Sequence, residues 1–443
     1  MSLFRFAPSP TGLLHVGNAR IAVMNALAAR HAGGRLLLRL DDTDTARSRP
    51  EYAQAIEQDL AWLGIAWDSL VRQTDRLQLY AAAAEKLRAA GRLYPCFESE
   101  EELKYKREQR LRLGKPPVYD RGALKMTAEQ RAKAEANGKR PYWRFLLSGR
   151  TVAWRDAVLG ARHVKLPALS DPVLVRADGS FLYTFTSVVD DIDLGVFQVI
   201  RGEDHVTNTG IQIDLIEALG GAAPGFGHLP LLADAGGEKL SKRIGSLSLR
   251  SLRNDGIEPE VVVGFLTALG TGEPPTVGSI ASLAPGFDLS RYGNSSARFD
   301  PAQLLALNRR HLHGLPFAAV RDRLPPGATE AFWNAVRGNL DLLSEARGWW
   351  EVASGTIVPP VIEGEGDYLR AAVAALPDAP WDATVWDRWI EAVKQATGRK
   401  GKALFRPLRL ALTGEEHGPE LREMLPLIGH DRASLRLRVA AGV

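Results

Sequence analysis

The sequence predicts an α/β fold built on a doubly wound parallel sheet, followed by an all-helical region. Short apolar strands alternate with helical segments near the N-terminus, the alternation resumes after a charged interruption, and strand signals fade after about residue 305. Strands and helices that alternate at this spacing are typical of parallel sheets. We therefore expect one domain at residues 1–305 and a helical domain at residues 306–443.

The N-terminal elements follow one another closely. Ser48 and Glu51 have the spacing of a capping box at the start of the second helix, and glycines close the helices. The predicted elements are strands at 3–7, 35–40 and 65–68 and helices at 17–32, 53–63 and 77–90.

A charged insertion of α+β character interrupts this pattern at about residues 95–180. The capping-box pairs Ser99/Glu102 and Thr127/Gln130 predict two helices, and PYWRFLL and TVAWRDAV predict strands. Parallel-sheet signals resume at 181–205. A helix over TGIQIDLIEALGG and a strand over LPLLAD follow.

Composition narrows the class of protein. The chain has 443 residues, enough for about three domains. Its single cysteine, Cys96, excludes an internal disulfide and a cysteine-based zinc cluster. The start MSLFRFAPSP has no signal-peptide core, and no apolar stretch is long enough to span a membrane. We expect a cytoplasmic protein without membrane contact and, in the absence of any coiled-coil pattern, a monomer.

The net charge of +4 is too small to indicate nucleic-acid binding, but its distribution is uneven. The run KQATGRKGKALFRPLR, residues 394–409, contains six basic residues and no acid. Arg399, Lys400 and Lys402 at its centre are candidates for contact with a polyanion. The alternative is an ordinary solvated face.

Two segments are suited to binding phosphates. RFAPSPTGLLHVGNAR places His15 and Gly17 between a first strand and its helix, and a helix N-terminus at the carboxyl end of a parallel strand attracts anions. ADAGGEKLSKRIGS carries Lys239, Lys242 and Arg243 on a glycine-containing loop after the last parallel strand. Either segment alone is more often structural or solvated, whereas together and in this order they indicate a nucleotide site.

These two segments resemble the HIGH and KMSKS signatures of class I aminoacyl-tRNA synthetases. RFAPSPTG, RLDDTD, VVDDID, RGEDHVTNT, HLPLL and FDPAQLLALN are similar to bacterial glutamate–tRNA ligases over roughly residues 3–310. The resemblance implies a Rossmann-type catalytic domain, an insertion for the tRNA acceptor end, a KLSKR-bearing segment at 235–250 and an anticodon-binding helical domain. It also implies that glutamate and ATP, with Mg²⁺, form an adenylate, and that the glutamyl group then passes to the terminal adenosine of tRNA(Glu).

The resemblance also suggests site residues. Those expected at ATP are His15, Gly17, Asn18, Lys239, Ser241, Lys242 and Arg243. Glutamate has two carboxylates and one ammonium, so its pocket needs two cations and an anion. Those expected at glutamate are Arg5 and Tyr183 for the side-chain carboxylate, Arg201 for the α-carboxylate, Ser9 and Asp41 for the ammonium, and Ala7 and Ser187 alongside.

The chain departs from the family pattern at three positions. Asp41 stands where the family usually has glutamate, and Ser187 where asparagine is frequent. Both changes bear on glutamate affinity rather than on the reaction. Many relatives carry a cysteine-rich zinc site in the insertion, whereas Cys96 stands alone here, so we expect no zinc and no other resident metal.

Several alternatives stay open. DDTD and VVDDID could ligate a divalent cation, although turn and cap roles are expected for Asp42, Asp44, Asp190 and Asp191. The helical tail argues against a glutaminyl enzyme with β-rich anticodon modules and against enzymes that glutamylate a modified tRNA base. A non-catalytic tRNA-binding paralogue and a small-molecule nucleotidyltransferase are the remaining classes. Whether tRNA(Gln) is a further or preferred substrate, and whether activation requires tRNA, is not decided by the sequence.

Overall fold

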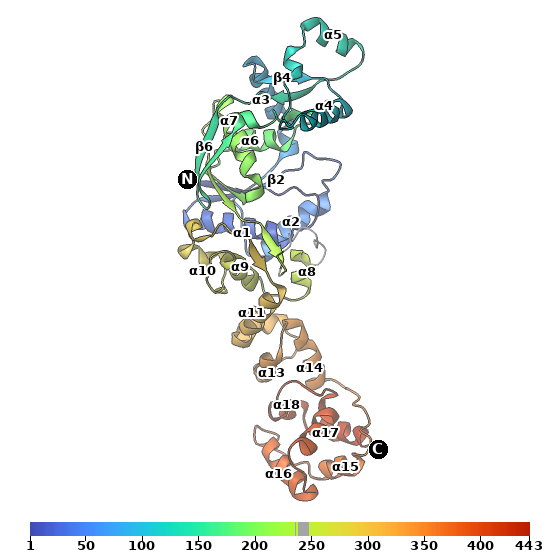
Figure 1. Ribbon diagram of the computed structural model, residues 1–443. Coiled ribbons are helices and arrows are strands. Elements are labelled where there is room, and N and C mark those ends of the chain that lie inside the picture. Colours follow the sequence, from blue (N-terminus) through green and yellow to red (C-terminus); the bar gives the residue numbers. More distant parts are fainter. Residues whose placement is uncertain (235, 238–247) are drawn as a thin grey trace. The chain divides into compact units, whose positions relative to one another are not determined.

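The structure, a computed structural model, describes residues 1–234, 236–237 and 248–443 (Figure 1). The chain divides into two compact units. The first comprises Met1–Arg253 and Pro259–Asp300, and the second comprises Asn254–Glu258 and Pro301–Val443.

A seven-stranded sheet forms the centre of the first unit, in the order β3-β2-β1-β9-β10-β6-β7. Neighbouring strands are parallel except for β6 and β7. The strands are β1 (Leu3–Phe6), β2 (Arg35–Leu40), β3 (Ser69–Arg72), β6 (Thr151–Asp156), β7 (Gly160–Lys165), β9 (Gln198–Gly202) and β10 (Gly225–Leu229). The strand order reverses between β1 and β9, which is where ligands bind in open α/β sheets. The predicted doubly wound fold is confirmed.

Helices cover both faces of this sheet (Figure 1). Helix α1 (Val16–His31) packs against β1, β2 and β9 on one face. On the other face, Leu3, Leu37 and Val199 share a core with helices α3, α6 and α7. The remaining helices of this unit, apart from single turns, are α2 (Pro50–Trp62), α3 (Leu77–Ala89), α6 (Tyr183–Asp193), α7 (Val206–Ala218), α8 (Leu249–Asn254), α9 (Pro259–Ala268) and α10 (Ile280–Leu283).

The charged insertion forms its own three-stranded antiparallel sheet, in the order β4-β5-β8. Both predicted capping boxes, at Ser99 and Thr127, are confirmed. Its elements are β4 (Leu93–Cys96), α4 (Glu100–Arg112), α5 (Ala128–Ala136), β5 (Tyr142–Phe145) and β8 (Val173–Val175). The TVAWRDAV segment is a strand as predicted, but it joins the seven-stranded sheet as β6.

Two predictions near the second helix are wrong. Residues 65–68 are not a strand: the N–H of Ile65 donates to the Leu60 carbonyl at the end of α2 (2.9 Å), and the Asp68 carboxylate accepts from the Leu36 amide (2.7 Å). Strand β3 therefore starts at residue 69. The Ser48/Glu51 capping box does not form, because the helix begins at Pro50 with Arg49 in the N-cap position.

Two later strand assignments also need correction. Residues 183–193 form helix α6, so only β9 carries the sheet within 181–205. The segment 229–234 is not one strand, since proline has no N–H for a ladder and Pro230 separates β10 from β11 (Leu232–Asp234). Strand β11 pairs with β12 (Ala297–Phe299) in a separate two-stranded sheet.

Every regular element of the second unit is a helix, as predicted for the C-terminal region. Trp333 and Trp389 lie at zero exposure in one apolar core, and their indole N–H groups donate to the carbonyls of Leu315 and Ala372 (both 2.9 Å). Its helices are α11 (Pro301–Gly314), α12 (Phe317–Val320), α13 (Glu330–Val336), α14 (Ala346–Ser354), α15 (Gly366–Ala374), α16 (Val385–Thr397), α17 (Lys402–Thr413), α18 (Leu421–Ile428) and α19 (His430–Ala440).

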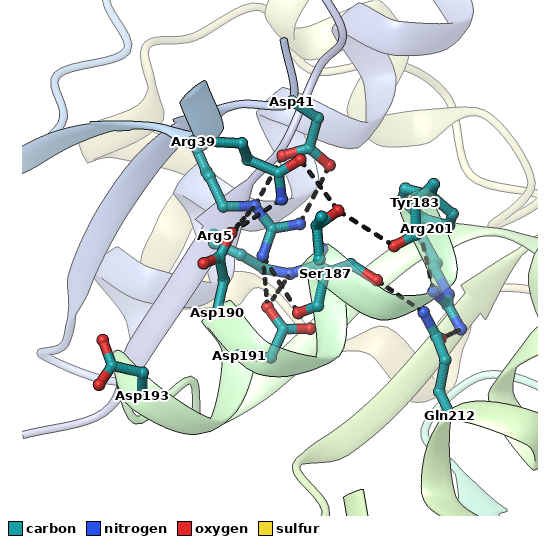
Figure 2. Close-up of polar contacts among 12 residues, drawn as sticks. Arg5, Arg39, Asp41, Tyr183, Ser187, Asp190, Asp191, Asp193, Arg201 and Gln212 are labelled. Atoms are coloured by element: carbon teal, nitrogen blue, oxygen red, sulfur yellow. Dashed lines mark hydrogen bonds and ion pairs between the residues drawn. The ribbon is translucent and has the colours of Figure 1, made fainter. Parts of the chain in front are cut away.

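A buried ion cluster joins the first unit's sheet to helix α6 (Figure 2). The fully buried Arg39 of β2 donates through Nε and Nη2 to both oxygens of Asp41 (2.7 and 3.1 Å) and through Nη1 to Asp191 of α6 (2.9 Å). Asp190 accepts from Gln73 and Arg76 (both 2.8 Å). The turn and cap roles expected for Asp190 and Asp191 are therefore wrong.

Replacement of Arg39 by alanine would leave Asp41 and Asp191 buried without this cation. We expect Arg39→Ala to lower the free energy of unfolding of the first unit by about 3–5 kcal/mol. The matched control is Arg47→Ala, which removes an exposed pair with Asp44 and should cost at most about 1 kcal/mol. Chemical denaturation of both variants measures the difference, and equal losses would contradict the assigned role of Arg39.

Candidate active site

His15 lies at the N-terminus of α1, directly after the loop that follows β1. Its Nδ1 accepts from the backbone amides of Gly17 (3.0 Å) and Asn18 (3.3 Å), so the ring is the N-cap of the helix. Burial lowers the pKa of His15, which keeps the ring neutral. With Nδ1 accepting, the proton is on Nε2, which can donate to a phosphate oxygen at the helix N-terminus.

Gly17 leaves no space for a side chain. A Cβ at this position would lie 2.7 Å from Cε1 and 2.9 Å from Nδ1 of His15. The glycine is required here by the close approach of the histidine ring, which explains why the two residues occur together.

The chain returns to His15 after the segment 238–247. Ser248 forms an isolated antiparallel bridge with His15, and the amide of Leu249 donates to the Leu14 carbonyl (2.9 Å). The expected phosphate-binding residues Lys239, Ser241, Lys242 and Arg243 lie outside the described residues.

Arg5 projects from β1 at the switch point of the sheet. It is 4 % exposed, and its Nε donates to Asp191 (3.3 Å). Among the described residues this is its only protein partner, so both terminal nitrogens can still donate to a ligand. Ala7 is half-buried and Ser9 is exposed in the loop that follows the strand.

Arg201 lies on the neighbouring strand β9 and is 6 % exposed. Its nitrogens donate to neutral groups: to His228 Nε2 (3.2 Å), to the Tyr183 hydroxyl (3.3 Å), and to Thr209 and Gln212 (2.6 and 2.7 Å). Within the described chain it forms no ion pair. Burial lowers the pKa of Arg201, the positive charge of Arg5 adds to this effect, and Tyr183 and Asp191 oppose it.

Gln212 and Ser187 connect these two arginine environments (Figure 2). Gln212 accepts from Arg201 through Oε1 and donates through Nε2 to the hydroxyl of the fully buried Ser187 (2.9 Å). The carbonyl of Ser187 accepts from Arg39 Nη1 (3.4 Å). Ser187 therefore links the two halves of the cluster.

Arg201 differs from the other arginines of this cluster because no carboxylate of the described residues pairs with it. Arg5, Arg39 and Arg76 pair with Asp41, Asp190, Asp191 and Asp193, so the four arginines and the four aspartates of the network are equal in number. The guanidinium of Arg201, at the carboxyl end of β9, is thus suited to accept the carboxylate of a ligand.

Asp41 stands at the end of β2, 6 % exposed. Burial raises the pKa of Asp41, and the adjacent Arg39 opposes that rise. Both carboxylate oxygens already accept from Arg39, but each oxygen has a second lone pair with which to receive a cationic group.

Sequence reasoning did not find Arg39, Thr209, Gln212, His228 or Asp156 as members of this cluster. Arg39, Thr209 and His228 occur inside RLDDTD, RGEDHVTNT and HLPLL, where they served only as signs of the family, and Asp156 lies in a predicted strand. Nothing in their spacing shows that strands β2, β6, β9 and β10 bring them together. The strand order supplies that information.

Some basic residues of the run 394–409 in the second unit are already engaged by other side chains. Arg399 pairs with Glu365, and its guanidinium lies 4.1 Å from the centre of the Tyr368 ring. Lys400 and Lys402 are exposed. Lys400 and Lys402 are therefore better candidates than Arg399 for contact with a polyanion. None of the described helices is long and apolar enough to cross a bilayer.

Replacement of Gly17 by alanine should push the His15 ring out of its N-cap position. We expect Gly17→Ala to slow adenylate formation by about 10²- to 10³-fold, the cost of one lost transition-state donor. Gly12→Ala is the control in the same loop, because no atom lies within 4 Å of its added Cβ. Pyrophosphate exchange in the presence of tRNA, at a rate measurable for the unmodified enzyme, tests both variants; equal rates for the two would show that His15 does not act at the phosphate site.

Comparison with known proteins agrees with this geometry. Residues 3–282 match the family described as tRNA synthetases class I (E and Q), catalytic domain, and residues 362–441 match an anticodon binding domain. The chain is 64% identical over 439 residues to glutamate–tRNA ligase 2 of Granulibacter bethesdensis, covering 99% of this chain and 98% of that protein. It is 63% identical over 444 residues to the enzyme of the same name from Acidiphilium cryptum, covering all of both chains.

A crystal structure of a glutamate tRNA ligase from Elizabethkingia meningosepticum has the same fold, with a TM-score of 0.86 at 24% identity, and the match covers 100% of this chain and 99% of that one. The sheet order, the motifs on it and these matches together show that the chain belongs to the glutamate–tRNA ligase family of class I aminoacyl-tRNA synthetases.

Proposed function

We propose that the chain ligates L-glutamate to the 3′-terminal adenosine of tRNA(Glu), through a glutamyl-adenylate formed with ATP. The observation that carries the proposal is the buried guanidinium of Arg201, which hydrogen-bonds only to neutral groups among the described residues and lies with Arg5 at the switch point of the sheet. Glutamate has two carboxylates, and each of these two arginines can bind one of them.

In this proposal the two carboxylates of glutamate are held by different arginines. The free terminal nitrogens of Arg5 bind the side-chain carboxylate, with the Tyr183 hydroxyl beside it, and Arg201 binds the α-carboxylate. Asp41 and Ser9 receive the ammonium group. Ala7 and Ser187 complete the walls of the pocket.

The nucleotide end of the site is assigned to the two signature segments. Neutral His15 donates from Nε2 to the ATP phosphates, and Gly17 and Asn18 present backbone at the start of α1. Lys239, Ser241, Lys242 and Arg243 clamp the triphosphate as charge develops on the leaving pyrophosphate. ATP binds as its magnesium complex.

The chemistry requires no covalent nucleophile from the protein. The α-carboxylate of glutamate attacks the α-phosphate of ATP and pyrophosphate leaves; the terminal hydroxyl of tRNA then attacks the adenylate carbonyl and AMP leaves. The protein contributes position and electrostatic stabilisation. Since arginine pairs with the carboxylates of Asp41, Asp190 and Asp191, a direct divalent-cation site on these residues is disfavoured.

Charging assays test the proposal directly. Purified tRNA(Glu) and tRNA(Gln) transcripts are incubated with the enzyme, ATP and labelled glutamate, with labelled glutamine as the control. We expect glutamate on tRNA(Glu); glutamate on tRNA(Gln) as well would extend the substrate range. Absence of charging on both would favour a non-catalytic paralogue and contradict the proposal.

We propose that the insertion holds no zinc. Burial raises the pKa of the Cys96 thiol to about 12, so zinc would have to displace this proton to bind the sulfur. In the described part of the chain, no group of three possible metal ligands includes Cys96. Elemental analysis of the dialysed enzyme should find well under one zinc per chain; one tightly held zinc would overturn this expectation.

We propose that the second unit binds tRNA through its basic run, and that the enzyme acts as a cytoplasmic monomer. Lys400→Ala with Lys402→Ala should weaken tRNA binding and lower its salt dependence by about one to two phosphate contacts, with ATP affinity unchanged. Arg399 is left in place because it pairs with Glu365.

Arg422→Ala is the control for that double variant, since the Arg422 charge is already paired with Asp387 in the same unit. Filter binding at several salt concentrations measures the slope. A slope unchanged by the lysine substitutions would mean that this face does not contact tRNA.

A further inference from the structure

A second buried pair lies directly behind Arg201. Asp156 ends β6 and His228 lies in β10, and both side chains have zero solvent exposure. His228 Nδ1 lies 2.5 Å from Asp156 Oδ2, and His228 Nε2 lies 3.2 Å from Nε of Arg201. The aspartate therefore reaches the arginine only through the imidazole ring.

The hydrogen bonds define the tautomer of this ring. A carboxylate can only accept, so the proton of His228 is on Nδ1 and is donated to Asp156. Nε2 is then an acceptor, which is what the Nε–H of Arg201 requires. Burial lowers the pKa of His228, which keeps the ring neutral.

Backbone amides of the turn between β6 and β7 also hold Asp156 in place. Asp156 Oδ1 accepts from three backbone amides, those of His228 (3.0 Å), Val158 (3.1 Å) and Leu159 (3.0 Å). Oδ2 is left for His228, with a longer contact from the indole N–H of Trp154 (3.4 Å). Burial would raise the pKa of Asp156, but the hydrogen bonds from His228 and these amides hold it below its usual range.

We infer that Asp156 and His228 are positioning residues for glutamate binding, which hold the imidazole in the Nδ1–H tautomer and thereby aim the guanidinium of Arg201 at its carboxylate. The inference rests on the proposed assignment of Arg201 to glutamate. His228 engages the Nε edge of the guanidinium, while Thr209 and Gln212 engage Nη2. One N–H of Nη1 contacts the Tyr183 hydroxyl, and the second is available to the carboxylate of glutamate. The hydrogen bonds at Nε and Nη2, rather than an ion pair, set the direction of this second N–H.

The variant Asp156→Asn changes the tautomer of His228 while keeping the oxygen that the backbone amides of the β6–β7 turn require. The three backbone amides still need an acceptor, so the amide oxygen takes the Oδ1 position and the amide nitrogen faces His228. The ring must then accept at Nδ1 and carry its proton on Nε2, where it opposes the Nε–H of Arg201 and donates instead to the Thr209 hydroxyl, which lies 2.8 Å away.

We expect Asp156→Asn to weaken L-glutamate binding by about tenfold or more, with ATP binding unchanged, in calorimetric titrations of the full chain. Asp171→Asn is the matched control: it is a buried aspartate of the insertion that likewise accepts from a backbone amide, that of Leu147, and it should bind glutamate as the unmodified enzyme does.

A second pair of variants keeps the test decisive should Asp156→Asn fail to fold. His228→Gln retains an acceptor near the Nε2 position, whereas His228→Leu retains none. We expect His228→Gln to bind glutamate several-fold more tightly than His228→Leu. Adding Asp156→Asn to His228→Gln should cost little further, because the imidazole whose tautomer it inverts is gone.

The outcomes separate this inference from the proposed function. If the unmodified enzyme does not bind glutamate, the proposed function fails. If it binds glutamate and Asp156→Asn binds within twofold of it, or if His228→Gln and His228→Leu bind alike, the positioning role is overturned. Equal weakening for glutamate and ATP would indicate general damage to the sheet and would likewise overturn it.

Discussion

The first unit depends on the placement of arginines on three adjacent parallel strands. Arg5, Arg39 and Arg201 are all less than one tenth exposed, so each guanidinium must be matched by the groups around it. Arg39 is matched by Asp41 and Asp191, and Arg5 shares Asp191. Arg201 contacts neutral acceptors alone among the described residues, and this difference supports its proposed role in binding a carboxylate of glutamate.

The same constraint explains why helix α6 lies where it does. Asp190 and Asp191 are consecutive, yet one pairs with Arg76 and the other with Arg39 and Arg5. Their ion pairs fix the helix against β2 and the start of α3. Tyr183 and Ser187, on earlier turns of that helix, are thereby brought to Arg201 and Gln212. The charges that hold α6 in place thus also position the side chains that we propose to bind glutamate.

Much of this could be predicted from the sequence. The apolar runs, the glycines and the signature segment around His15 were sufficient for the α/β class, the helical C-terminal region and the candidate arginines. The sequence could not show that Arg39 neutralises Asp41, that residues 183–193 form a helix, or that His228 stands between Asp156 and Arg201. The last of these depends on strand order, which places residues 72 positions apart in one hydrogen bond, whereas the first two are local features that the sequence patterns did not reveal.

The central claim is that Arg5 and Arg201 each bind one of the two carboxylates of glutamate. Calorimetric titration of the enzyme with L-glutamate, its γ-amide glutamine and its α-amide isoglutamine tests this most directly, because each amide removes a single carboxylate charge at almost constant shape. The account predicts that either amide binds at least about tenfold more weakly than glutamate. Binding of either amide with the affinity of glutamate would contradict it.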